Sequence, residues 1–478
     1  MSQNWAIAIG QAVHTRARAL CLALIVFLTG AAGCFGGKDG DETVEPLRHR
    51  ITVWSLEFQP DRLRATKANI AAFTRATRIG VDLVPIGDDE LPSRMARARS
   101  AGHMPDVAQL PLDSLHTYAG ENLLDTTVPQ DVLERLGDDT FSQTALSLAS
   151  QESRIVGVPS DGWGQLLIYR RDLFRRAGLQ PPTTLEDIQR AARRLDRGPL
   201  AGIALPDAPD ENFTAEIFEH IALAAGCELV DDRGHVSLDT RRCRRAFRYY
   251  VALARDDARR SVGRTTRDTA RDLYFSGRTA MMFWSPFVLD AMAGLTDDAE
   301  PTCPQCRRDP AFLARNSGLV GPLSSGHGTP AQYGSISSWG VFKGADLDAS
   351  RRFVQYMLSD GYVRWLALSP QGKFPVRRGD ATDPERYFVA WERLRSGVER
   401  KAPLRRFYSK EAIDSLGEGV QAFRRWGFPH GQAALAGALR DSQPLSRAIA
   451  DAVDGHITPA GAATRVKAAV ERLRAPGE

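Results

Sequence analysis

From residue 51 onwards, short apolar runs alternate with stretches in which apolar residues recur at helical spacing. We expect strands at Ile51 to Leu56, Val81 to Pro85 and Val107 to Leu110. The segments between them, 62–77 and 91–101, have the spacing of amphipathic helices. Strands separated by helices predict crossover units and a mainly parallel sheet, so the pattern indicates an α/β protein.

The pattern changes most clearly between Arg154 and Leu195. Two apolar runs of strand length, Ile155 to Val158 and Leu166 to Tyr169, flank a break formed by Pro159 and the segment Ser160 to Gly164. Proline cannot donate a ladder hydrogen bond, and the two glycines of the break allow backbone conformations closed to other residues. We therefore expect a flexible turn between two strands, with the large aromatic ring of Trp163 inside it.

Helix boundaries are marked by specific residues. The helix that follows Tyr169 is expected to end at Gly178, and Thr184 with Asp187 forms a capping box for the next helix. Thr458 and Pro459 have the residue types of an N-cap and a first helical position. Further helices are expected at 213–225, 240–255, 269–275 and from Asp348, and strands at 202–205, 319–323 and 334–342.

Several of these segments resemble one protein family. The gap after Val158-Pro159 followed by LLIYRRDLFRRAGLQPPTTLEDI resembles the carbohydrate-type extracellular solute-binding proteins of bacterial ABC importers, the class that includes maltose-binding protein. GRTAMMFWSPF from Gly277, YGSISSWGVFKGADLDASRRFVQYML from Tyr333 and DGHITPAGAATRV from Asp454 resemble later segments of the same family. The resemblance runs from about residue 50 to the end of the chain.

The resemblance implies a two-lobed, type II periplasmic-binding-protein-like fold. Each lobe would hold a central, mostly parallel sheet flanked by helices, and hinge crossings would join the lobes, the first at Ser160 to Gly164. The N-terminal lobe would comprise 51–160 and 322–343, and the C-terminal lobe 161–321 and 344–478. A ligand that contacts both lobes favours their closed arrangement.

The implied function is that of a substrate-binding lipoprotein. The protein would capture a mono- or oligosaccharide in an aromatic-lined cleft and deliver it to a membrane permease with its ATPase subunits, as a monomer without a cofactor. The net charge is +4, from 62 basic and 58 acidic residues mixed along the chain, so nucleic-acid binding is unsupported. The motifs GxSxG, HExxH and GxxxxGK[ST] are missing, and we expect a protein that is not an enzyme.

The first 34 residues read as a targeting segment. A basic region precedes the apolar run Ala19 to Leu28, and small residues lead to Cys34, which resembles a bacterial lipoprotein signal with a lipidated cysteine. Residues 35–50 read as a flexible tether. The protein would then be extracytoplasmic and lipid-anchored to the outer face of the cell membrane. Because Ala31 stands where that signal more often has leucine, a conventionally secreted protein is the alternative.

The other four cysteines beyond Cys21 and Cys34 form an even set, which favours disulfides outside the cytoplasm. We expect Cys227 to pair with Cys243, because they flank one excursion of the chain, and Cys303 to pair with Cys306. A four-cysteine zinc site is the alternative, although one CxxC pair with the other two cysteines sixteen residues apart fits it poorly.

Ligand-binding candidates cluster at expected strand ends. In open α/β sheets ligands bind beyond the carboxyl ends of the strands, and sugars need flat rings together with directional polar partners. Asp113 is instead expected to cap the helix that follows it. The candidates are Trp54, Glu57, Asp106, Asp161, Trp163, Trp284, Ser338 and Trp339.

Two other functions remain open from the sequence. A binding lipoprotein for a polyamine or peptide would use the same lobes around a more acidic cleft. A secreted carbohydrate-active enzyme would need a pair of carboxylates that face a glycosidic bond.

Overall fold

The computed structural model describes residues 47, 49–258, 263–326 and 329–474, which belong to the compact unit Pro46–Glu478. The targeting segment 1–34 with Cys34, and the tether up to residue 46, lie outside the described residues. The last two residues expected in the tether, His49 and Arg50, already belong to the first strand. No helix in the described part of the chain has both the length and the apolar character that a membrane span requires.

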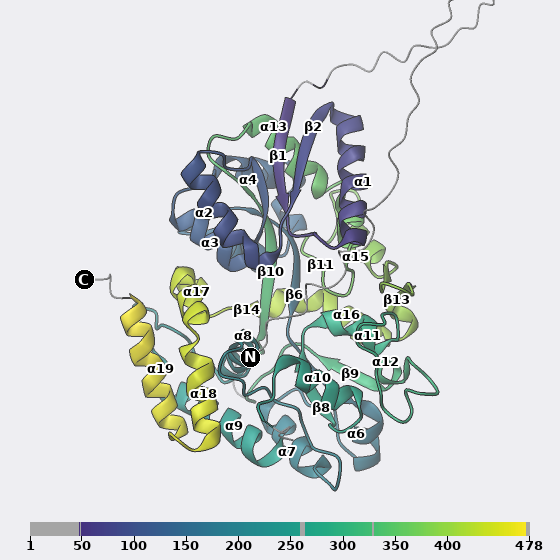
Figure 1. Cartoon of the computed structure of the whole chain (residues 1–478), viewed down its shortest axis with the longest axis vertical. Coiled ribbons are helices and arrows are strands. Elements are labelled where there is room, and N and C mark those ends of the chain that lie inside the picture. The colour runs from purple at the N-terminus through teal and green to yellow at the C-terminus, as the bar shows by residue number, and fades with distance from the viewer. Residues whose placement is uncertain (1–46, 48, 259–262, 327–328, 475–478) are drawn as a thin grey trace, which may run out of the picture. The chain divides into compact units, whose positions relative to one another are not determined.

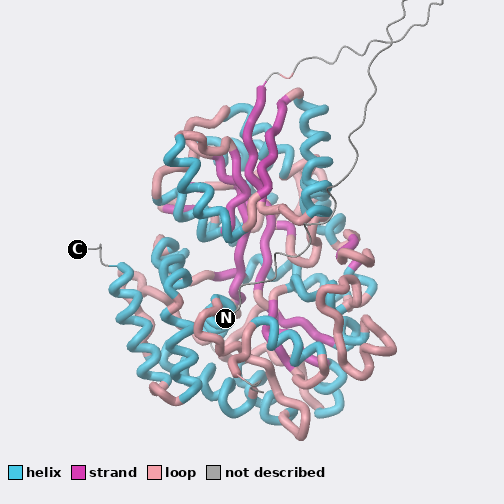
Figure 2. The backbone as a smooth tube through the Cα atoms, viewed as in Figure 1, coloured by secondary structure: helices cyan, strands magenta, loops and turns pink. Residues whose placement is uncertain are grey.

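A seven-stranded sheet forms the centre of the N-terminal lobe and reaches into the junction with the second lobe (Figures 1 and 2). Its order is β11-β6-β10-β3-β1-β2, with β14 beside β10. β1 runs parallel to β2 and β3, whereas β10 is antiparallel to β3 and β6. The strands are β1 (His49–Ser55), β2 (Ile79–Pro85), β3 (Val107–Pro111), β6 (Val158–Gly164), β10 (Gln332–Val341), β11 (Phe374–Pro375) and β14 (Phe423–Arg424).

A three-stranded sheet forms the centre of the C-terminal lobe. Its order is β8 (Met281–Trp284), β7 (Leu166–Arg170) and β9 (Ser317–Val320), and both pairings are antiparallel. The α/β class and the two-lobed architecture are confirmed. Strand directions are more mixed than expected, because β6 and β10 run antiparallel to each other and continue the chain into and out of this second sheet. The strand expected at 202–205 forms only isolated bridges.

Helices surround both sheets (Figure 1). Those of the N-terminal half are α1 (Pro60–Thr77), α2 (Leu91–Ala101), α3 (Leu112–Gly120), α4 (Thr127–Leu136) and α5 (Gln143–Leu148). The next set is α6 (Arg171–Ala177), α7 (Leu185–Leu195), α8 (Asn212–Ala224), α9 (Arg241–Ala252), α10 (Arg267–Phe275), α11 (Leu289–Met292) and α12 (Phe312–Asn316). The last set is α13 (Leu347–Met357), α14 (Tyr362–Leu366), α15 (Arg386–Trp391), α16 (Lys410–Glu418), α17 (Ala433–Ser442), α18 (Pro444–Asp454) and α19 (Pro459–Arg474).

The helices α13 and α14 lie with the N-terminal lobe, although the sequence placed everything after residue 343 in the C-terminal lobe. The ring of Phe353 in α13 contacts Phe73 of α1 with 5.3 Å between centroids. The side-chain amide of Asn69 donates to the carbonyl of Gly361 at 3.0 Å. This apolar and polar packing against α1 corrects the expected lobe boundary.

The segment expected to be a turn at Ser160 to Gly164 is strand β6, paired with both β10 and β11. The pairing shifts between Ser337 and Ser338, which leaves Ser160 as the extra residue of a bulge next to Pro159. The two glycines serve close packing instead of a turn. A Cβ at Gly162 or Gly164 would lie 3.1 or 2.5 Å from the ring of Phe423.

The passage between the lobes lies at the end of β6. β6 ends at Gly164 and β7 begins at Leu166, so the single residue Gln165 separates a strand of the first sheet from a strand of the second. The backbone N–H of Gln165 donates to the carbonyl of Tyr333 at 2.9 Å, which ties this point to the neighbouring strand β10.

The helix ends and the cysteine pairs that the sequence predicted are found in the structure. Gly178 ends α6 in the left-handed conformation with φ of 70°, and the Thr184 hydroxyl donates to Asp187 at 2.7 Å while accepting the N–H of that residue. Cys227 is bonded to Cys243, and Cys303 to Cys306. Since all four sulfurs are in disulfides, the zinc alternative is replaced by the expected pairing.

Candidate ligand-binding cleft

A cleft of about 650 Å³ lies where the two lobes meet. The N-terminal lobe contributes residues 56–62 after β1 and the end of β3. The middle of β6 and β10 forms the back, and residues 372–373 join it there. The C-terminal lobe contributes the start of α8 and residues 285–287 after β8. The cleft is therefore built at strand ends of both sheets, as the expected architecture implies.

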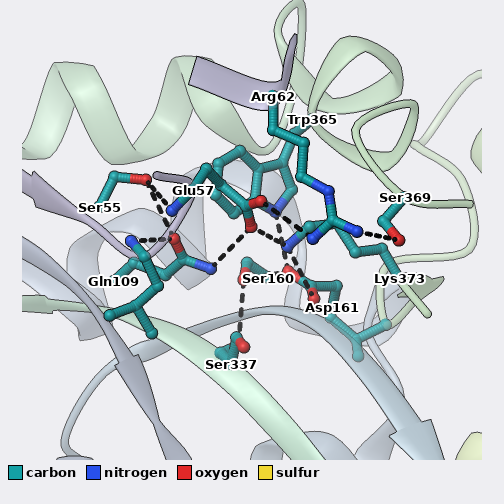
Figure 3. A network of polar contacts seen from close by, with 12 residues as sticks. Ser55, Glu57, Arg62, Gln109, Ser160, Asp161, Ser337, Trp365, Ser369 and Lys373 are labelled. Atoms are coloured by element: carbon teal, nitrogen blue, oxygen red, sulfur yellow. Dashed lines mark hydrogen bonds and ion pairs between the residues drawn. The ribbon is translucent and has the colours of Figure 1, made fainter. Parts of the chain in front are cut away.

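A buried lysine joins three segments at the base of the cleft (Figure 3). The Lys373 ammonium lies 2.9 Å from Glu57 Oε1 and 3.3 Å from Asp161 Oδ1, and 4.2 Å from the ring centre of Trp365. Burial alone would lower the pKa of Lys373, but the two carboxylates outweigh it and raise that pKa. Burial would likewise raise the pKa of Glu57, and Lys373 holds it below its usual value. Lys373 and Glu57 are therefore both charged at neutral pH.

Neutral and charged donors complete this network around both carboxylates (Figure 3). Asp161 Oδ2 accepts the indole N–H of Trp365 at 2.8 Å and the hydroxyl of Ser160 at 2.7 Å. Glu57 accepts a long bond from the Gln109 amide at 3.4 Å and lies 3.6 Å from the Arg62 guanidinium. Each carboxylate is thus engaged by at least one cation, and we assign both to the structure of the cleft base.

A second charged cluster borders the cleft through Asp113 and Arg440. Asp113 pairs with Arg425 at 3.3 Å and with Arg440 of α17. Arg425 also pairs with Glu219 of α8 at 3.3 Å and lies 4.6 Å from the ring centre of Tyr333. Burial would raise the pKa of Asp113, but the two arginines outweigh it and lower that pKa. Asp113 was expected to cap a helix; it instead joins α3 to α17, and Pro111 stands at the N-cap position of α3.

Aromatic rings from both lobes face the cleft. Phe58 and Phe287 are 49% and 38% exposed, which is unusual for side chains of this size, and both line the cleft. The rings of Trp163 and Phe287 lie with their centroids 6.3 Å apart. Both phenylalanines were missed from the sequence, because the aromatic candidates chosen as ligand-binding residues were all tryptophans. Their signal was available, since each stands three residues after the last residue of a strand, β1 or β8.

Of the expected ligand-binding residues, Glu57, Asp161 and Trp163 line the cleft. Trp54 lies within β1 and packs against the core. Trp284 is buried at the end of β8, where its ring packs against Phe213 with 5.3 Å between centroids. Neither of these two tryptophans is among the residues that line the cleft.

The other three expected residues also lie elsewhere. Trp339 is buried against Trp365, with 4.9 Å between their ring centroids. Asp106 accepts the backbone N–H groups of Thr52 at 2.7 Å and Asp346 at 3.0 Å, so it ties β1 to the start of α13. Ser338 is fully buried, whereas its neighbour Ser337 lines the cleft, because successive strand residues point to opposite faces.

Two α/β lobes around a cleft lined by rings and hydrogen-bonding groups define a two-lobed solute-binding protein. The family model described as bacterial extracellular solute-binding protein matches residues 59–364, and the chain belongs to that family. Its members are solute-binding proteins of ABC importers, and membership implies an extracytoplasmic location.

Known proteins are similar over most of the chain. A putative ABC transporter periplasmic-binding protein of Escherichia coli (strain K12) is 25% identical over 342 residues, which are 69% of this chain and 74% of that protein. The structure of maltose-bound MalE3 of T. maritima is 19% identical, with a TM-score of 0.64 over 89% of this chain and 100% of that one. A cyclic alpha-maltosyl-1,6-maltose binding protein from Arthrobacter globiformis is 16% identical, with a TM-score of 0.67 over 89% and 98%.

Proposed function

We propose that the protein binds a mono- or oligosaccharide in this cleft and delivers it to a membrane permease with its ATPase subunits. The observation that carries the proposal is the set of rings Phe58, Trp163 and Phe287, which come from both lobes and from the strand between them. The C–H faces of sugars pack flat on such rings. Similar solved structures hold maltose or other carbohydrates, which supports the same class of ligand.

Polar groups around the rings match the hydroxyl edges of a sugar. The side chains of Gln59, Asn212, Ser285, Ser335 and Ser337 line the cleft. Hydroxyls both donate and accept hydrogen bonds, so amide and hydroxyl side chains can serve them in either direction. A site of this kind fixes orientation with a few polar groups while rings supply the contact area.

The cleft also holds carboxylates, and a polyamine would need carboxylates that are free to pair with its ammonium groups. Three of the six are engaged by cations of the protein: Glu57 and Asp161 by Lys373, and Asp113 by two arginines. Burial raises the pKa of Glu216, which lowers its capacity to hold a cation. These pairings favour a neutral solute over a polyamine. They also leave neither Glu57 nor Asp161 free as a catalytic carboxylate.

The anchor and the oligomeric state belong to the same proposal. We place Cys34 as the lipidated residue, the predicted tether from residue 35 up to the start of β1 at His49, and a monomer at the outer face of the membrane. A solute that contacts both lobes would favour the closed arrangement, which the permease would recognise.

A thermal-shift screen tests the proposed ligand class. The panel holds monosaccharides, maltose, cellobiose, longer glycans and spermidine, and a ligand that binds only the folded state raises the melting temperature. We expect one or more sugars to raise it and spermidine to leave it unchanged. A shift with spermidine alone would overturn the carbohydrate assignment, and turnover of an oligosaccharide in the same samples would indicate an enzyme.

A further inference from the structure

A second hollow, which we call the α3–α17 groove, lies beside the cleft. Its volume is about 850 Å³, and it is lined by α2 and α3 of the N-terminal lobe and by α17. Figure 1 shows α17 next to α3 at the junction of the lobes. The groove presents hydroxyl side chains from α3, including Ser114 and Thr117, opposite the small residues of α17.

The groove and the cleft share two lining residues, Asp113 and Arg440. These two form an ion pair, so one side-chain contact borders both hollows. Asp113 is also held by Arg425, which is 3% exposed, and therefore keeps a cation when Arg440 moves. Arg440 is 35% exposed, and its Nε has no partner among the described residues. The Arg440 side chain can thus be displaced without stranding a buried carboxylate.

Gly437 stands in the interior of α17 and lines the groove. A Cβ at this position would meet no atom within 4 Å, so the packing of the protein does not require glycine there. Glycine weakens a helix interior relative to alanine, because it gives up more backbone freedom on folding. A glycine whose Cβ position is unoccupied allows a ligand to lie close to the helix backbone, which would account for glycine at position 437.

Gln151 supplies a polar group on the same groove. Its side-chain oxygen is buried and accepts no hydrogen bond from any described residue. A buried acceptor without a donor is unfavourable, and a ligand hydroxyl would provide the donor. This observation is independent of Gly437, because Gln151 belongs to a different element, the short strand β4 (Ser150–Gln151).

We propose that the α3–α17 groove is a second part of the ligand site, which receives the continuing residues of an oligosaccharide whose first residues occupy the cleft. The ion pair of Asp113 and Arg440 is the gate between the two parts. This inference rests on the proposed carbohydrate function and sharpens it, because it assigns the protein to chains longer than a disaccharide.

Calorimetric titration of the full chain tests the groove, with maltose, maltohexaose, cellobiose and cellohexaose as probes. Gly437→Trp places a large ring at a position whose Cβ is unobstructed, and Gly437→Ala is the matched control, because it changes the same backbone position by one carbon. We expect a hexasaccharide to bind wild type and Gly437→Ala about tenfold more tightly than the disaccharide does. Gly437→Trp should lose that gain and keep the disaccharide affinity.

Each of the other outcomes contradicts one part of the proposal. If Gly437→Trp binds the hexasaccharide as tightly as wild type, the groove is not part of the site. Equal affinity for both lengths in wild type overturns the groove alone and leaves the cleft proposal standing. If no probe binds, the site does not take glucan chains and the groove proposal fails, while the thermal-shift screen decides the carbohydrate proposal separately. Gly437→Leu, a smaller block, should give an intermediate loss and serves as the second variant if Gly437→Trp folds poorly.

Discussion

Replacement of Lys373 by methionine tests the charged base of the cleft. The variant keeps the length of the side chain and removes the cation that lies between Glu57 and Asp161. Removal of one partner from a buried ion pair costs about 3–5 kcal/mol, because the other charge is left without compensation. Since two carboxylates lose the same partner, we expect a loss of about 4 kcal/mol or more in the free energy of unfolding at pH 7.

The loss should depend on pH in a defined direction. The raised pKa of Lys373 means that its contribution is fully present below pH 10.5, and the lowered pKa of Glu57 means that its contribution is present above pH 4.5. The contribution of the wild-type pair to the free energy of unfolding is therefore constant between pH 4.5 and pH 10.5. In the variant, burial raises the pKa of Glu57, so protonation stabilises the folded state as pH falls. The difference between variant and wild type should shrink from pH 8 to pH 5.

Urea unfolding followed by tryptophan fluorescence at pH 5, 7 and 8 measures these differences. Lys410→Met is the matched control, because Lys410 pairs with Asp414 in one helix and is 78% exposed. Exposed pairs of this kind contribute about 0.3–0.5 kcal/mol. The reasoning is refuted if Lys373→Met costs no more than Lys410→Met, or if its cost grows as pH is lowered.

Three further predictions follow from the site and the fold. Trp163→Ala should abolish the sugar-induced changes in fluorescence and melting temperature while the protein stays folded; unchanged affinity would remove this ring from the site. Loss of the Cys227–Cys243 disulfide, which spans a separation of 16 residues, should lower the free energy of unfolding by about 3 kcal/mol in urea titrations. Loss of the Cys303–Cys306 disulfide, with a separation of 3, should lower it less, and an equal effect would argue against the loop-closure account. Burial raises the pKa of Asp290 to about 6, so its ionisation destabilises the folded state as pH rises from 4 to 6. Asp290→Asn should reduce the difference in melting temperature between pH 4 and pH 7.5, and an unchanged difference would contradict this assignment.

The alternation of strands and helices was readable from the sequence because it depends on local periodicity. The helix ends at Gly178 and Thr184 were readable for the same reason, since each cap is made by residues close in the chain. The segment after Pro159 was not, because its strand pairing depends on partners in β10 and β11 that are distant in sequence.

The candidate site was predicted only in part. Trp163 was found because a ring between two glycines is poorly buried by local structure. Trp339 was chosen for the same kind of position in the sequence. It is nevertheless buried, because Trp365 of α14 packs against it. Lys373 carried no signal at all in the sequence. Its role arises from Glu57 and Asp161, which reach it only through the tertiary fold.

The ring of Phe423 determines when the joint between the two lobes can form during folding. It fills the space above Gly162, Gly164 and Gly334, where a Cβ at Gly334 would lie 2.1 Å from it. The two strands that join the lobes are therefore packed by a ring from a much later part of the chain. Contacts of such long sequence separation carry a large loop-closure cost before they stabilise the fold. The three-stranded sheet and six strands of the larger sheet come from earlier segments. The seventh strand, β14, and the joint that Phe423 packs stay incomplete until residue 423 has been synthesised, so a ligand-competent cleft requires nearly the whole chain.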